Sequence, residues 1–163
     1  MEKTHILSIT VENESGVLTR VAGLFSARGF NIDSICVAKT LEKNESKMII
    51  ATSGDAQILE QIVKQLNRLI NVIKVQEFTD DDSVLRQTVL VKVNADETTK
   101  GDIFRIKEIF NGRIIDVSRN HYTLEVTGSE KKIDSLIDIL RPLGIKDIVK
   151  TGIIALASAK KII

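Results

Sequence analysis

Hydrophobic and polar residues alternate near the start of the chain and then recur at helical spacing. Leu7, Ile9 and Val11 alternate with polar residues, a pattern typical of a half-buried strand. After the turn-prone segment 12–16, apolar residues follow at helical spacing until Gly29. Glycine at that position is suited to end a helix in the left-handed conformation. The sequence therefore predicts a strand followed by a helix.

Three further strands and a second helix complete the first half. Segments 31–39, 46–53 and 72–78 have strand-like patterns, and the polar turn 40–45 joins the first two. The helix expected between the second and third segments follows a glycine and Asp55, which can cap it. The predicted order of elements is βαββαβ.

The second half of the chain repeats this design. The apolar stripe of the second helix recurs at the same spacing later in the chain, and the two sets are Leu59, Ile62, Leu66 and Leu69, and Ile133, Leu136, Leu140 and Leu143. Ser129 can cap the later helix, and Pro142 lies near its end. Strands are expected near 85–94, 113–118, 122–127 and 148–154. Both halves predict an α+β fold of two tandem ferredoxin-like domains, each a four-stranded antiparallel sheet with two helices on one face.

An acidic segment separates the halves. Three consecutive aspartates lie within residues 79–83, and their charges repel one another and extend the chain. We therefore expect an N-terminal domain at 1–79, a linker at 80–83 and a C-terminal domain at 84–163. Domains of this size bury only about 60% of their unfolded surface and are marginally stable alone. The apolar strand at 31–39 is expected at an edge of its sheet. This exposed edge predicts edge-to-edge pairing into a homodimer.

Composition argues against several classes of partner. The chain has 163 residues, of which 43% are hydrophobic and 28% charged, as in ordinary globular proteins. Its 23 Lys and Arg nearly balance 22 Asp and Glu, and it has no Trp and one Tyr, so neither a nucleic acid nor a membrane is an expected partner. A single cysteine and the lack of a signal-peptide pattern predict a cytoplasmic location.

The sequence contains no recognisable catalytic or metal-binding arrangement. His5 and His121 fall in different halves, and Cys36 lies inside an apolar strand. No Cys–His pair, metal-ligand spacing or glycine-rich phosphate loop is visible. We therefore expect no catalytic residues, no metal site and no enzymatic activity in this chain.

The remaining candidate site is the loop 13–16 that leads into the first helix. Helix N-termini present unpaired N–H groups, so the carboxylate of an amino acid can bind near Gly16 and Val17. The amide oxygens of Asn13 and Asn31 can accept hydrogen bonds from its ammonium group. Asn31 begins the edge strand and would face the other subunit's loop across a dimer interface.

A small branched side chain would fit an apolar pocket beside this loop. Val17, Leu18 and Ile32 would line the pocket. The alternative is a simple turn with Ser15 as the helix cap. The corresponding segment of the second half, 94–99, has no glycine, which indicates that the two halves differ in role.

The residues from Asn13 onward resemble a known family. Residues 13–26, Asn-Glu-Ser-Gly-Val-Leu-Thr-Arg-Val-Ala-Gly-Leu-Phe-Ser, resemble the ACT domain that opens the regulatory (small) subunit of acetohydroxyacid synthase, also called acetolactate synthase. Further similar blocks extend the resemblance over nearly the whole chain, at 28–32, 59–62, 64–67, 115–118, 125–128 and 150–152.

The resemblance implies a non-catalytic subunit that activates a catalytic subunit and confers feedback inhibition by valine in branched-chain amino-acid biosynthesis. The cofactors, thiamine diphosphate, Mg²⁺ and FAD, would belong to that partner, and none is expected in this chain. Asn13, Gly16 and Asn31 match family positions associated with valine at the ACT dimer interface. Two residues depart from the family pattern: Cys36 replaces a frequent hydroxyl residue and Ile153 a common arginine. A free-standing ACT-type sensor that regulates another partner is the alternative function.

Overall fold

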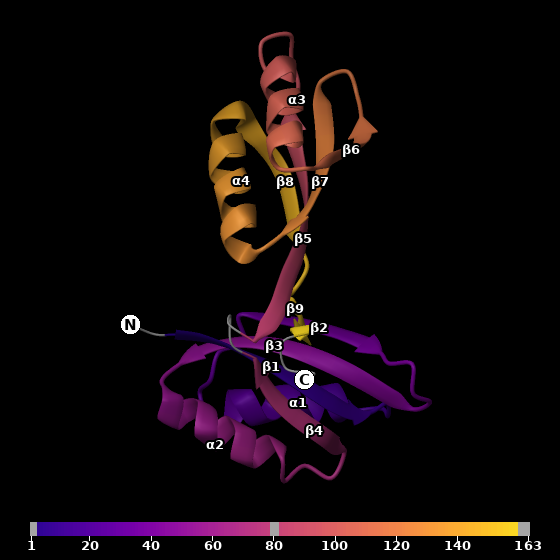
Figure 1. Ribbon diagram of the computed structural model, residues 1–163, viewed down its shortest axis with the longest axis vertical. Coiled ribbons are helices and arrows are strands. Elements are labelled where there is room, and N and C mark those ends of the chain that lie inside the picture. Colours follow the sequence, from indigo (N-terminus) through magenta and orange to yellow (C-terminus); the bar gives the residue numbers. More distant parts are fainter. Residues whose placement is uncertain (1–2, 79–81, 160–163) are drawn as a thin grey trace. The chain divides into compact units, whose positions relative to one another are not determined.

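The computed structural model describes residues 3–78 and 82–159 (Figure 1). The chain divides into two compact units, one formed by residues 1–85 with 152–163 and the other by residues 86–151. Among the described residues, no helix combines the length and apolar character needed to cross a bilayer.

The sheet of the first unit has the strand order β2-β3-β1-β4, with all neighbours antiparallel. Its elements are β1 (Lys3–Glu12), α1 (Val17–Ala27), β2 (Ser34–Lys39), β3 (Glu45–Gly54), α2 (Ala56–Leu66) and β4 (Val72–Phe78). Figure 1 shows α1 and α2 on one side of this sheet. Strand β2 lies at the edge, as the sequence predicts.

The helix-covered face of this sheet carries the first hydrophobic core, here called the helix-side core. Alternate strand residues pack against the apolar stripes of the two helices, and the buried set is Leu7, Ile9, Val11, Val17, Val21, Phe25, Met48, Ile50, Leu59, Ile62 and Leu66. The predicted helix boundaries are confirmed by their hydrogen bonds. Asp55 accepts from the Ile58 N–H at 2.8 Å, and Gly29, at φ 70°, lets the Phe30 N–H reach the Phe25 carbonyl at 3.0 Å.

The opposite face of the first sheet is covered by the end of the chain. Strand β9 (Ile154–Ala157) lies on the side away from the helices in Figure 1. Ile153 and Ala155 are 6% and 5% exposed and pack against buried residues of this face, Ile6, Ile49, Ala51 and Phe78. These contacts bury a second cluster, here called the outer cluster, which the helices do not reach.

One predicted strand, 148–154, is wrong. The chain forms β8 (Ile145–Lys150) and β9, which are separated at Gly152. The Thr151 N–H bonds to the Thr88 carbonyl, whereas the Ile153 N–H is 3.5 Å from the Ser34 hydroxyl. The break arises because Gly152 lies against the backbone of β2, where only a residue without a side chain fits. A Cβ at Gly152 would lie 2.8 Å from the carbonyl carbon of Ile35.

The domain limits differ in the same region. The sequence predicts a C-terminal domain at 84–163, but residues 152–159 pack with the first unit. Two residues of the predicted linker 80–83, residues 80 and 81, lie outside the described part of the chain. Ser83 already begins β5 (Ser83–Asn94).

The second unit repeats the design of the first. Its sheet has the order β6-β7-β5-β8, and β9 also pairs with β5. The new elements are α3 (Lys100–Ile109), β6 (Arg113–Val117), β7 (His121–Gly128) and α4 (Glu130–Gly144). Both helices contact one core, which consists of Val89, Val91, Val93, Ala95, Ile103, Ile106, Phe110, Leu124, Val126, Ile133, Leu136 and Leu140. The two units therefore confirm the predicted tandem α+β fold.

The capping residues of α4 follow the prediction. The Ser129 side chain accepts from the Lys132 N–H, and Pro142 lies in the last turn. The helix ends at Gly144, whose φ of 90° is unfavourable for other residues.

Candidate functional site

The candidate loop lies between β1 and α1. Gly16 is the N-cap of α1 and has φ 83°, in the left-handed region that favours glycine. None of the described side chains caps this helix, so Ser15 is not the cap. A Cβ at Gly16 would meet no other atom within 4 Å. The space beside Gly16 is therefore open. The Val17 N–H donates to the Glu14 carbonyl at 3.4 Å, so an anion can bind the N–H groups of the first turn that follow Val17.

Asn13 is tied to the hairpin between β2 and β3. Its N–H donates to the Asn44 carbonyl at 2.7 Å, and its Oδ1 accepts from the Ser46 hydroxyl at 3.1 Å. An amide oxygen has two lone pairs, so Oδ1 keeps one for a ligand. The loop is thus held in place while Asn13 retains its capacity as an acceptor.

Asn31 follows α1 and is held by its own neighbours. Its Nδ2 donates to Asp33 at 2.7 Å, and its carbonyl accepts from the Thr52 hydroxyl at 2.6 Å. With Nδ2 fixed on Asp33, the side-chain oxygen is the atom left to accept from a ligand.

The structure places Asn13 and Asn31 at opposite ends of α1. This helix has 11 residues, which corresponds to a length of about 16 Å. The register of β3 shows the same separation, because Asn13 bonds to Ser46 near one end and Asp33 bonds to Ala51 toward the other. One chain does not bring the two asparagines together, so a site that uses both needs two chains.

The three predicted apolar residues have different environments. Val17 is 3% exposed and belongs to the helix-side core, and Ile32 is half-buried against it. Leu18 is 48% exposed. Leu18 is thus the one of the three that presents most of its side chain to a ligand or a second subunit.

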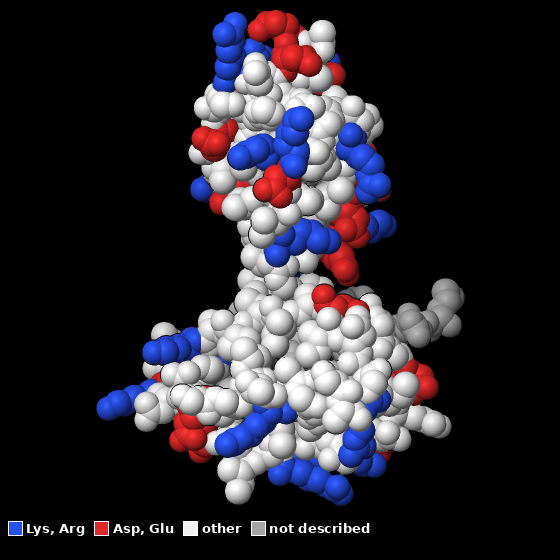
Figure 2. Space-filling view, turned by 180° about the vertical axis from the view of Figure 1, so that it is seen from behind, with Lys and Arg blue, Asp and Glu red and all other residues white. Residues whose placement is uncertain are grey.

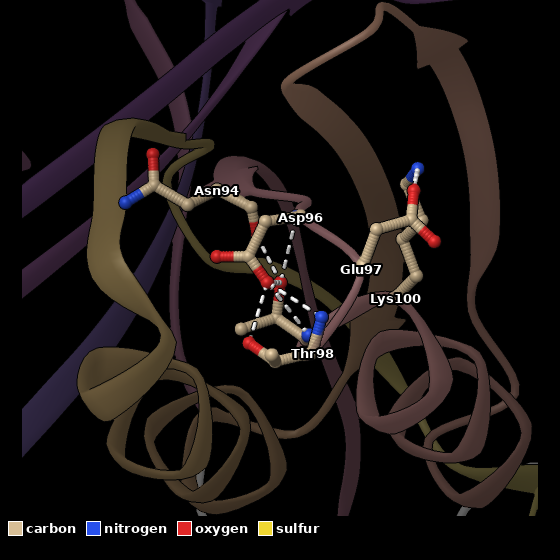
Figure 3. Close-up of polar contacts among 6 residues, drawn as sticks. Asn94, Asp96, Glu97, Thr98 and Lys100 are labelled. Atoms are coloured by element: carbon tan, nitrogen blue, oxygen red, sulfur yellow. Dashed lines mark hydrogen bonds and ion pairs between the residues drawn. The ribbon is translucent and has the colours of Figure 1, made fainter.

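In the second unit, an acidic side chain bonds within the loop that precedes α3 (Figure 3). The Asp96 carboxylate accepts from the N–H groups of Thr98 and Thr99 at 2.8 and 2.9 Å, and from the Thr98 hydroxyl at 2.6 Å. These bonds, led by that of the Thr98 hydroxyl, lower the pKa of Asp96. The loop before α3 is therefore closed by its own carboxylate at the N-cap residue, although none of the described side chains caps the first turn of α3.

Sequence reasoning missed Asn71, a buried residue beside the loop. Asn71 lies in the turn before β4, is 6% exposed, and bonds to Glu12, Glu14 and Arg20. The sequence cue is weak, because an asparagine between a helix and a strand is usually an exposed turn residue.

No other arrangement of reactive groups emerges from the described residues. His5 lies 3.2 Å from both Glu77 and the Gly54 carbonyl, in a different unit from His121. No group of three His, Cys, Asp or Glu among the described residues could hold a metal. On the face that Figure 2 shows, acidic and basic side chains are interspersed in each unit.

Comparison with known proteins identifies the family. Residues 7–74 match the small-subunit-like ACT domain of acetohydroxyacid synthase, and residues 86–159 match the small subunit of acetolactate synthase. The acetolactate synthase small subunit of Mycolicibacterium smegmatis is 46% identical over 154 residues, which cover 94% of this chain and 91% of that protein. The chain belongs to the acetolactate synthase small-subunit family. The resemblance found in the sequence is confirmed.

Other small subunits agree with this assignment. The small subunit of Aquifex aeolicus is 44% identical over 155 residues, which cover 94% of this chain and 81% of that protein. The crystal structure of the Thermotoga maritima small subunit has a TM-score of 0.89 at 39% identity, with coverage of 96% and 98%. The segment Gly152–Ala157 falls within the region that matches small subunits, although it packs with the ACT unit.

Proposed function

We propose that this protein is the regulatory subunit of acetolactate synthase, which binds the catalytic subunit, raises its activity and makes it sensitive to valine. The observation that carries the proposal is the uncapped N-terminus of α1 at Gly16, in a chain of the small-subunit family. Thiamine diphosphate, Mg²⁺ and FAD are then cofactors of the catalytic partner.

Valine fits the chemistry of the loop. Its carboxylate binds the N–H groups of the first turn of α1, where the helix dipole favours negative charge. Its ammonium group donates to the side-chain oxygens of Asn13 and Asn31. The side chain of valine lies beside Leu18, Val17 and Ile32, of which Leu18 is the most exposed.

The exposed edge of the first sheet supports a homodimer. Strand β2 has one free side, and its Ile35 and Val37 are 37% and 41% exposed. A second copy that pairs with this edge can cover these two side chains. The additional strand pairing would join two ACT sheets into one.

Antiparallel pairing of β2 about a two-fold axis also completes the ligand site. Asn31 precedes the Ser34 end of β2, and the Lys39 end pairs with Ser46, the residue that bonds to Asn13. Two antiparallel copies place the Ser34 end of one strand beside the Lys39 end of the other. Asn31 of one subunit therefore approaches the Asn13 loop of its partner, as a shared site requires.

Feedback inhibition follows if valine favours one arrangement of this dimer. The coupling free energy is the difference between the free energies of valine binding to the free and to the complexed regulatory subunit. In typical allosteric proteins it is about 1–3 kcal/mol, which corresponds to a change in affinity of roughly 5–150-fold. By linkage, binding of the catalytic subunit changes valine affinity by the same factor.

Calorimetric titration of valine into the wild type and the Gly16→Asp variant tests the proposal. The added carboxylate repels that of the ligand and occupies its place, so binding is expected to be lost. Gly101→Asp is the control, because Gly101 lies on α3 and a Cβ there meets no other atom within 4 Å. In the activation assay, Gly16→Asp should still activate the catalytic subunit but no longer respond to valine.

Two results would count against this function. Valine binding without any association with the catalytic subunit would favour a free-standing sensor. A persistent monomer of 18.1 kDa in sedimentation at micromolar concentration would contradict the shared site.

A further inference from the structure

A buried asparagine connects the turn before β4 to the loop of the proposed valine site. The Asn71 Nδ2 donates to Oε2 of Glu12 at 2.7 Å and to Oε2 of Glu14 at 3.3 Å. Its Oδ1 accepts from Arg20 on α1, and its carbonyl accepts from the Glu12 N–H at 2.9 Å. Carboxylates only accept and a guanidinium only donates, so these partners fix the orientation of the amide.

We propose that Asn71 is a positioning residue for valine binding, which holds the Glu14 carboxylate away from the N-terminus of α1. The inference rests on the proposed function of the loop. By holding Glu14, Asn71 keeps the N–H of Gly16 and the N–H groups that follow Val17 available to the carboxylate of the ligand; the Val17 N–H itself bonds to the Glu14 carbonyl.

The Glu14 carboxylate can compete with the carboxylate of the ligand for these N–H groups, because Glu14 lies close to an uncapped helix terminus. A carboxylate near such a terminus binds its N–H groups and is stabilised by the helix dipole. The second unit has a related arrangement, since Asp96 lies three residues before the N-cap Thr99 and accepts from the N–H groups of Thr98 and Thr99. Glu14 lies two residues before Gly16, within reach of the equivalent groups.

A neutral amide is the group that this position requires. Two carboxylates converge on Nδ2, so a third carboxylate in its place would repel both of them. Aspartate has nearly the same shape as asparagine, and Asn71→Asp therefore changes the charge while preserving the packing. The variant should release Glu14 from the turn.

The test compares valine titrations of the full-length protein and three variants. Asn71→Asp is expected to bind valine at least about tenfold more weakly. Asn67→Asp is the matched control, because Asn67 lies in the same turn and its side chain bonds to the Val63 carbonyl. The double variant Asn71→Asp, Glu14→Gln should bind more tightly than Asn71→Asp alone, because the competing charge is gone.

Amide hydrogen exchange over residues 15–19, measured without valine, gives a readout that is independent of the ligand. Exchange is expected to slow in Asn71→Asp as Glu14 binds these amides, and to return toward the wild-type rate in the double variant. Unchanged or faster exchange in Asn71→Asp, or a double variant that binds valine no better, would overturn the inference.

The failure of the proposed function has a different signature. If the wild type binds no valine, the proposed ligand is wrong, and the exchange rates alone decide whether Asn71 restrains Glu14. If the wild type and Asn71→Asp bind valine equally well, the proposed function survives and the positioning role is rejected.

Discussion

Replacement of Ile153 by alanine tests whether the end of the chain belongs to the core of the ACT unit. Ile153 is 6% exposed and packs in the outer cluster with Ile49, Ala51 and Phe78. These residues lie on the sheet face opposite the helices, so the contact is separate from the helix-side core. The variant removes apolar volume from one side of this cluster and leaves the strand register unchanged.

The expected loss of stability follows from the atoms removed. Isoleucine to alanine deletes three carbon atoms, worth about 2.4 kcal/mol at about 0.8 kcal/mol each. A residual cavity adds to this cost, and buried Ile→Ala substitutions span about 2–5 kcal/mol. The outer cluster lies close to the surface and can partly collapse, so we expect about 2–3 kcal/mol.

Ile154→Ala is the matched control, because Ile154 is the next residue along the chain and its side chain is 51% exposed. Denaturant unfolding gives the change in the free energy of unfolding, and amide exchange in β1 and β3 shows whether the loss falls on the ACT unit. The control is expected to lose less than about 1 kcal/mol. Equal losses for the two variants, or faster exchange confined to residues 86–151, would refute the packing described.

Two other predictions concern single residues. Gly152→Ala should destabilise the protein by about 1–3 kcal/mol in denaturant unfolding, because its Cβ would meet the Ile35 backbone at 2.8 Å; Gly23→Ala on α1, where the added Cβ meets nothing within 4 Å, should be neutral or stabilising. For Asp96 the pKa is lowered from 3.8 in the folded state, so its stabilising effect is present above that pH and is lost as the pH falls through the lower folded value. Asp96→Ala should therefore lower the thermal stability at neutral pH and weaken its decrease in acid, and an unchanged acid profile would contradict this role.

Local patterns were sufficient to predict most of the fold. The apolar stripes of α2 and α4 predict both helices, and the caps Asp55 and Ser129 accept the hydrogen bonds expected of them. Glycine at position 29 has the left-handed conformation that its place after α1 requires. These features depend on residues close together in sequence, so a single sequence contains the information needed to predict them.

Features that depend on distant contacts were not predictable in this way. The apolar residues at both ends of 148–154 are compatible with one strand or with two, and the close approach of Gly152 to Ile35 exists only in the folded chain. In the sequence, an asparagine at position 71 cannot be distinguished from an exposed turn residue. Its burial depends on Glu12 and Arg20, which are far away in sequence.

The N-termini of α1 and α3 differ in how the loops before them are arranged. Both α1 and α3 follow the first strand of a βαββαβ unit and present N–H groups at the same place. In the second unit, Asp96 accepts from the N–H groups of Thr98 and the N-cap Thr99, and the loop contains no glycine. In the first unit, Gly16 contributes no side chain, and Asn71 bonds to the nearby Glu14 carboxylate. A helix terminus therefore becomes a candidate ligand site through two features together, the lack of a capping side chain and the restraint of the nearest acidic one.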